Sequence, residues 1–300
     1  MDQISSTATN HPLLGAGFML AAGIGFAAVN VVTQYAGMVA GITPATTAFF
    51  QYFIALLFAL PWLARTGFGA LVTRHPLLHV ARVVLSAIGV QLWVSALAVV
   101  PIWLGIALLM TSPFFVVGGA VLFLGERVTL LRVGATLMGF AGAVIILQPW
   151  SASFTWYALL PIGAAALWAG ATLLTKYLTR DEKPESITTY LLLLLTPINA
   201  AFFFAGGAVL PDAGGWLVLV ALGLATVLAQ YLLTRAYAVA DATYLQPFDD
   251  LKLPLNILLG WLVFATAPDL SFWPGAALIV AASLLIMQQE AARRRQLQHA

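Results

Sequence analysis

Long apolar runs, each about the length of one membrane-crossing helix, follow one another along this chain with only short connections between them. A helix needs about 20 mostly apolar residues to cross a bilayer. The runs are continuous and do not alternate between apolar and polar positions, which favours helices over the strands of a membrane β-barrel. The pattern predicts ten spans, near residues 13–36, 44–63, 77–97, 101–124, 132–149, 155–178, 187–209, 215–238, 243–264 and 274–289.

The composition agrees with this all-α integral membrane fold. Of the 300 residues, 62% are hydrophobic and only 8% are charged, whereas a soluble domain has about 25% charged residues. The chain has no cysteine, which excludes disulfides, thiol catalysis and cysteine-based metal sites. The polar N-terminal stretch has no Lys or Arg, so we expect the first apolar run to remain as a span and not to act as a secretory signal.

The positions of Lys and Arg predict which connections face the cytoplasm, because positive residues concentrate in cytoplasmic loops. If the N-terminus is inside, all of the 13 positive residues except Arg82 and Lys252 fall in the inside connections or at the inside ends of spans. The outside connections hold none. Both termini are therefore predicted to be cytoplasmic.

The two halves of the chain resemble each other. Residues 96–126 align without gaps to residues 236–266, and residues 134–147 resemble residues 275–287. We therefore expect two five-helix repeats, at 1–149 and 150–300, and because five is odd the second repeat is inverted. Inverted repeats are typical of transporters that bind substrate near the midplane between the halves. The alternative is chance similarity between apolar helices.

A family resemblance follows from these features. The Leu-Gly-Glu tripeptide at 124–126, within "FLGERVTLLRVGATLMGFAGAVII", and the five-plus-five spans resemble the EamA-type members of the drug/metabolite transporter superfamily over nearly the whole chain. In the second half, Thr266 stands where the first half has Glu126. Within the superfamily the chain is most similar to the YddG-type exporters of aromatic amino acids. The resemblance implies a multi-pass protein of the bacterial inner membrane that exports amino acids, aromatic ones favoured, by alternating access.

The ninth predicted span contains charged residues in the stretch "QPFDDLKLPLN". At 1.5 Å per residue, Asp249 to Lys252 lie about 10–14 Å along this helix, near the membrane midplane. Asp249, Lys252 and Asn256 share one face, whereas Asp250 points elsewhere. A charge at this depth costs at least about 2.5–3.5 kcal/mol, so we expect these four residues to contact substrate. The alternative is an Asp–Lys pair with a purely structural role.

Other polar and aromatic residues within spans are further candidates for substrate contact. Arg82 would pair with a substrate carboxylate or an Asp, unless it extends toward lipid phosphates. Interhelical hydrogen bonds are the alternative for the amides. Candidate polar contacts are Asn30, Gln91 and Gln230, and candidate cavity walls are Trp103 and Trp168. Two helical stripes hold several of these positions: His79, Arg82, Ser86, Gly89 and Trp93 in the third span, and Gly223, Thr226, Gln230, Thr234 and Tyr237 in the eighth.

The expected function is that of a monomeric secondary transporter for a small molecule, with no nucleic-acid partner, metal or cofactor. A nucleotide-sugar or sugar-phosphate transporter is an alternative, but it needs several clustered cations and the spans offer Arg82 and Lys252. A membrane-embedded transferase is another alternative, but the sequence lacks a second acidic cluster to accompany "FDD". A channel would need a ring of like charges, which the sequence does not indicate.

The predicted topology can be tested by cysteine labelling, because the parent chain has no cysteine. A cysteine at Ser151, in the connection predicted to face outward, should react with a membrane-impermeant maleimide added outside right-side-out vesicles. Ala70→Cys, in a connection predicted to face inward, should react only after the vesicles are opened. Labelling of the Ser151 variant from the inside alone would contradict the topology.

Overall fold

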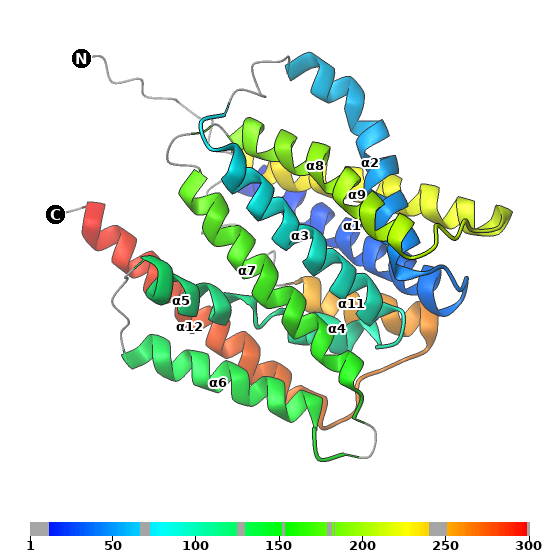
Figure 1. Cartoon of the computed structure of the whole chain (residues 1–300). Helices are drawn as coiled ribbons and strands as arrows, with labels where there is room; N and C mark the ends of the chain where they lie inside the picture. Colours follow the sequence, from blue (N-terminus) through cyan, green and yellow to red (C-terminus); the bar gives the residue numbers. More distant parts are fainter. Residues whose placement is uncertain are drawn as a thin grey trace, which may run out of the picture.

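The computed structural model describes residues 12–66, 73–124, 130–151, 154–178, 182, 184–239 and 251–298, and within these ranges it is helical with no β-strand. The helices pack together in a single bundle (Figure 1). In chain order they are α1 (Pro12–Met38), α2 (Pro44–Thr66), α3 (Pro76–Leu97), α4 (Ile102–Leu109), α5 (Ser112–Leu124), α6 (Leu130–Leu147), the short 3-10 helix η2 (Trp156–Leu159), α7 (Leu160–Leu178), α8 (Pro184–Ala205), α9 (Ala213–Val239), α11 (Lys252–Phe264) and α12 (Phe272–Gln298).

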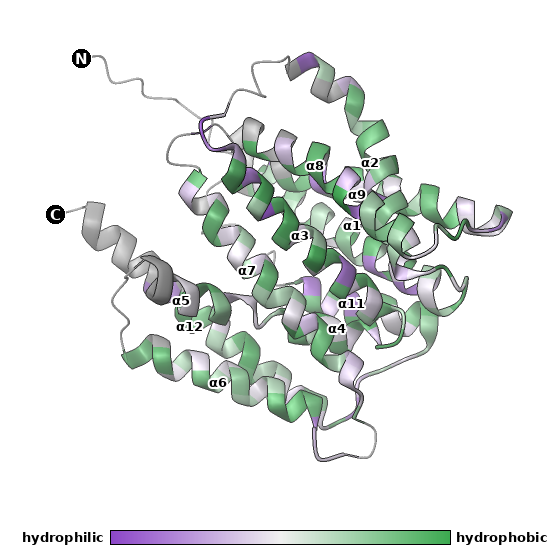
Figure 2. Cartoon of the chain, in the orientation of Figure 1, coloured by the Kyte–Doolittle hydropathy of each residue, from purple (hydrophilic) through white to green (hydrophobic). Residues whose placement is uncertain are grey.

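The helices account for the ten predicted spans. Within the described ranges, six helical segments are long and apolar enough to cross a membrane, and shorter apolar helices of 10–17 residues lie in the other four predicted spans. Figure 2 shows apolar residues along most of each helix. The expected all-α integral membrane fold is therefore confirmed.

Proline and glycine set many of the helix boundaries. Proline suits the first helical position because its missing N–H has no partner there anyway. Glycine adopts the positive φ angle that commonly ends a helix, as at Gly41 after α1 (φ 64°) and Gly207 after α8 (φ 89°). The helices that begin at a proline are α1, α2, α3 and α8.

The fourth predicted span is broken, although the sequence pattern predicted a continuous helix there. Helix α4 ends at Leu109 and α5 begins at Ser112. Pro113 explains the break, because its ring clashes with the carbonyl group four residues earlier, which belongs to Leu109. The Thr111 hydroxyl donates a hydrogen bond of 2.7 Å to the carbonyl oxygen of Leu108, which satisfies a backbone acceptor beside the break.

Several described helices correspond between the two halves as the internal repeat predicts. Helices α5 and α11 each have 13 residues, and Lys252 follows Ser112 by the same interval of 140 positions as the sequence alignment. Packing is paired in the same way: α1 packs on α9 as α7 packs on α3, and α2 packs on α9 as α8 packs on α3. The end of α5, the start of α6 and the end of α12 lie on one side of the bundle, at the left in Figure 1. Which side faces the cytoplasm stays a prediction.

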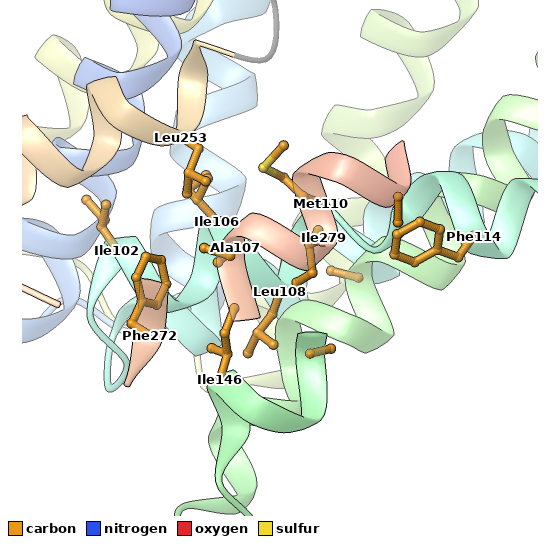
Figure 3. Close-up of a cluster of buried hydrophobic side chains, with 14 of the residues drawn as sticks. Ile102, Ile106, Ala107, Leu108, Met110, Phe114, Ile146, Leu253, Phe272 and Ile279 are labelled. Atoms are coloured by element: carbon orange, nitrogen blue, oxygen red, sulfur yellow. The ribbon is translucent and has the colours of Figure 1, made fainter. Parts of the chain in front are cut away.

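Among the described residues, five hydrophobic clusters stabilise the bundle, and two of them are the largest. One lies mainly among α4, α5, α6, α11 and α12, and Figure 3 shows Phe114, Ile146 and Phe272 within it. The other lies among α1, α2, α8 and α9 and includes Phe50 and Phe203. Residues of both clusters and of two smaller ones line a central cavity.

Helices α6 and α12 cross at two glycines. A Cβ atom added to Gly142 would lie 2.6 Å from the backbone oxygen of Gly275, and one added to Gly275 would lie 2.6 Å from the backbone oxygen of Gly142. Both distances are shorter than real Cβ contacts. Small residues allow membrane helices to approach closely and to gain van der Waals contact.

A larger side chain at this crossing should therefore destabilise the protein. We expect Gly142→Val to cost about 1–3 kcal/mol, as overpacking typically does, and to lower the unfolding temperature in detergent. Gly134→Val is the matched control in the same helix, since nothing lies within 4 Å of a Cβ atom at that position. Equal unfolding temperatures for the two variants would contradict the tight crossing.

Candidate functional site

A cavity of about 360 Å³ lies at the centre of the bundle. Ligand cavities in proteins commonly measure about 300–1,000 Å³, so this one has room for a small metabolite. Eight helices contribute to its wall, namely α1, α2, α3, α4, α7, α8, α9 and α11. Helices α5, α6 and α12 do not contribute to it within the described residues.

An amide pair forms one polar part of the cavity wall. Asn30 of α1 donates a hydrogen bond from Nδ2 to Oδ1 of Asn256 of α11 at 3.0 Å. The indole Nε1 of Trp93 donates to Oδ1 of Asn30 at 3.3 Å, and Nδ2 of Asn256 donates to the backbone oxygen of Lys252 at 2.6 Å. Each amide nitrogen has a second hydrogen to donate, so the pair can also bind a ligand acceptor.

A second polar group lies on α2 and α9. Nε2 of Gln51 donates to the hydroxyl oxygen of Thr226 at 3.1 Å, and that hydroxyl donates to the Leu222 carbonyl oxygen at 2.8 Å. Gln230 lines the cavity one helical turn beyond Thr226. These side chains supply both donors and acceptors without a formal charge.

Trp93 and Trp168 form an aromatic corner of the cavity. Their ring centroids are 6.3 Å apart and their planes meet at 53°. Nε1 of Trp168 donates to the backbone oxygen of Ser86 at 3.2 Å, which ties α7 to α3. Both tryptophans and Ser86 line the cavity. A flat aromatic ligand can pack against such a corner through stacked or edge-to-face contacts.

Half of the candidate residues from the sequence meet at this cavity. These are Asn30, Trp168, Gln230, Lys252 and Asn256. Ser86, Trp93 and Thr226 lie in the predicted helical stripes and also line it, but they were not singled out as contacts. Gln51 and Tyr52 were missed, although a glutamine within the apolar stretch "AFFQYF" was a usable signal.

Three other candidates are not among the described lining residues. Gln91 donates to Oδ1 of Asn199 at 2.9 Å, on the α8 side of α3. Trp103 lies near the start of α4, where its ring packs edge-on against Phe272. Arg82 lies one turn before Ser86 along α3. The remaining candidates, Asp249 and Asp250, lie outside the residues that the structure describes.

Arg82 makes hydrogen bonds to two neighbouring helices. It is 5% exposed, and its guanidinium group donates to the Ile187 carbonyl oxygen at 2.6 Å and to the Thr175 hydroxyl at 3.3 Å. It therefore joins α3 to α7 and α8 just beyond the cavity.

An ion pair lies one turn from Arg82, closer to the N-terminal end of α3. Nε2 of His79 lies 2.5 Å from Oε2 of Glu182, and Thr73 donates to the same carboxylate. Burial raises the pKa of Glu182, but the hydrogen bonds from Thr73 and His79, the charge of His79 and the backbone of Arg74 outweigh burial, so the pKa lies below its ordinary value. This cluster fastens the α7–α8 connection to α3.

The described part of the cavity lining is mostly uncharged. Its described lining contains amides, hydroxyl groups and two indoles, and Lys252 is the one residue with a formal charge among them. No cluster of His, Asp or Glu that could hold a metal occurs in the described ranges.

The fold and the cavity together are typical of a membrane transporter built from two repeats around a central cavity. The chain belongs to the EamA-like transporter family, whose model matches residues 13–148 and again residues 155–288. The expected family is therefore confirmed, and the chain is a transporter and not an enzyme.

Several curated proteins are similar over most of their length. A riboflavin transporter of Brucella anthropi is 57% identical, covering 87% of this chain and 94% of its own. A riboflavin transporter of Vibrio cholerae is 48% identical, covering 90% and 92%. An S-adenosylmethionine uptake transporter of Rickettsia bellii is 28% identical, covering 89% and 91%. The expected resemblance to YddG-type aromatic amino-acid exporters finds no support among these relatives.

A solved crystal structure shares the fold. It superposes with a TM-score of 0.61, covers 96% of this chain and 98% of its own, and is 20% identical.

Two amide pairs give a matched test of the site. Asn30 and Asn256 line the cavity, whereas Gln91 and Asn199 are not among its described lining residues. Asn30→Ala removes an amide that lines the cavity, so we expect weaker substrate binding and a KM for transport about threefold to tenfold higher, as loss of one net hydrogen bond implies. Asn199→Ala removes the Gln91 partner outside the described lining. It should lower the unfolding temperature and leave KM near the parent value. The same KM change in both variants would contradict the assignment of the cavity as the binding site.

Proposed function

We propose that this protein transports riboflavin across the bacterial inner membrane. The main support is the identity of 57%, 54% and 48% to three proteins named riboflavin transporters, from Brucella anthropi, Rhizobium johnstonii and Vibrio cholerae. All three matches extend over at least 87% of this chain and at least 90% of the relative.

The chemistry of the cavity supports the same substrate. Riboflavin joins a flat, fused aromatic ring system to a chain of hydroxyl groups and has no formal charge near neutral pH. The aromatic corner of Trp93 and Trp168 matches the ring system in shape and polarity. The amide pair of Asn30 and Asn256 suits the donor and acceptor edge of the ring, and the polar group around Gln51 suits hydroxyl groups.

Alternating access follows from the repeat architecture. We propose that the halves 1–149 and 150–300 rock against each other and open the cavity to one side of the membrane at a time. Leu109, at the break between α4 and α5, and Lys252, at the start of α11, both line the cavity. A change of angle at these helix ends would reshape the cavity without unfolding a whole span.

The relatives do not fix the direction of transport. One is named an S-adenosylmethionine uptake transporter, and another, from Pseudomonas aeruginosa, is named a pseudopaline exporter and is 29% identical. The proposal also includes three expectations from the sequence. These are export as the direction of transport, the cytoplasmic position of both termini and a monomeric state.

The proposal is tested with purified protein in liposomes. Riboflavin should accumulate in proteoliposomes faster than in protein-free liposomes, and unlabelled riboflavin should compete with the labelled substrate. Phenylalanine and tryptophan should not compete at the same concentrations, because they lack the fused ring system and the hydroxyl chain. Adding riboflavin either outside or inside the proteoliposomes would measure the direction of transport.

Two results would contradict riboflavin as the substrate. One is a riboflavin rate equal to that of protein-free liposomes, with the protein shown to be folded by its unfolding transition. The other is stronger competition by phenylalanine or tryptophan than by riboflavin itself, which would instead favour the aromatic amino acids expected from the sequence.

A further inference from the structure

The indole of Trp168 lies directly on the backbone of α3 at Gly89. A Cβ atom added to Gly89 would lie 2.5 Å from Nε1 and 2.7 Å from Cδ1 of Trp168. Real Cβ atoms essentially never approach other heavy atoms so closely. The ring can therefore occupy this position only because residue 89 has no side chain.

The hydrogen bond from Nε1 to the backbone oxygen of Ser86 requires the same close approach. A helix carbonyl has two lone pairs, so the Ser86 oxygen can accept from the indole and from its own helix at once. Gly89 and the carbonyl oxygen of Ser86 thus both meet the ring at its Nε1 edge. The result is a fixed position for the indole on the cavity wall.

The related helix crossing in the other half has no such ring. Ala229 of α9 follows Gly89 by the repeat interval of 140 positions, and α9 packs there on α1. At that crossing a Cβ atom added to Gly25 would lie 3.0 Å from the Cβ atom of Ala229. Two small residues meet there, whereas α3 and α7 meet through a glycine and a tryptophan, so the two repeats differ at this contact.

We propose that Gly89 is a positioning residue for substrate, which holds Trp168 against α3 so that the aromatic corner fits the flavin ring system. This inference rests on the proposed transport of riboflavin. Gly89 itself need not touch the substrate, because its effect passes through Trp168. The corner then discriminates in favour of flat, fused rings, and its width depends on how closely the indole lies against α3.

A methyl group at position 89 would move the indole away from α3. An ordinary carbon contact is about 3.5 Å, so the ring would shift by about 1 Å and would lose its hydrogen bond to Ser86. We expect Gly89→Ala to weaken riboflavin binding on the order of tenfold, the usual scale for one aromatic contact. The loss should appear in KM and in the dissociation constant measured by flavin fluorescence, with the maximal rate less affected.

A double-mutant cycle separates positioning from a general packing defect. The variants are Gly89→Ala, Trp168→Leu and the two combined, in the full-length protein. If Gly89 acts through Trp168, Gly89→Ala should weaken riboflavin binding in the parent but change it little once Trp168 is leucine. Gly170→Ala is the matched control at the same α3–α7 interface, because its added Cβ atom would meet the flexible end of Leu85 at 3.3 Å. It should bind riboflavin like the parent.

The outcomes distinguish this inference from the proposed function. If the parent binds riboflavin and Gly89→Ala weakens binding equally with and without Trp168, the positioning role is overturned and the proposed function stands. If Gly89→Ala binds riboflavin like the parent, the positioning role is also overturned. A folded parent that binds no riboflavin would overturn both.

Discussion

A polar group buried in an apolar membrane costs free energy unless it finds a partner inside the protein, and much of the architecture of this transporter reflects that constraint. Most backbone groups form their hydrogen bonds within helices. At the break after α4, the Thr111 hydroxyl donates a hydrogen bond to the carbonyl oxygen of Leu108. Side-chain amides are satisfied in pairs between helices, as at Asn30 and Asn256 or at Gln91 and Asn199. Where such pairs border empty space, spare donors and acceptors become available to a substrate.

The cavity is bordered by residues of several separate hydrophobic clusters. Small residues bring α6 and α12 together on one side, and aromatic rings fill the space among α1, α2, α8 and α9 on the other. The two repeats carry unequal side chains at related positions, such as Gly89 and Ala229, and Gly89 allows the indole of Trp168, which lines the cavity, to lie against α3.

The sequence predicted part of the site because polar residues in an apolar span are conspicuous. Asn30, Gln230, Lys252 and Asn256 were found by this criterion and do line the cavity. Gln91 met the same criterion but points at Asn199. These residues differ from Gln91 in the direction in which the side chain leaves its helix and in the residues that it faces. The depth of a residue in its span predicts neither.

By itself, the sequence determined the all-α membrane fold, the number of spans and the internal repeat, because hydropathy and helix length are local properties. It did not determine that Pro113 would break the fourth span at that point, since proline can also lie inside a continuous helix, as Pro61 does in α2 and Pro197 in α8. Only the tertiary structure decided which polar residues surround the cavity and which join neighbouring helices. The reason is that contacts such as Trp168 on Gly89 connect helices far apart in sequence, and their geometry depends on how the whole bundle packs.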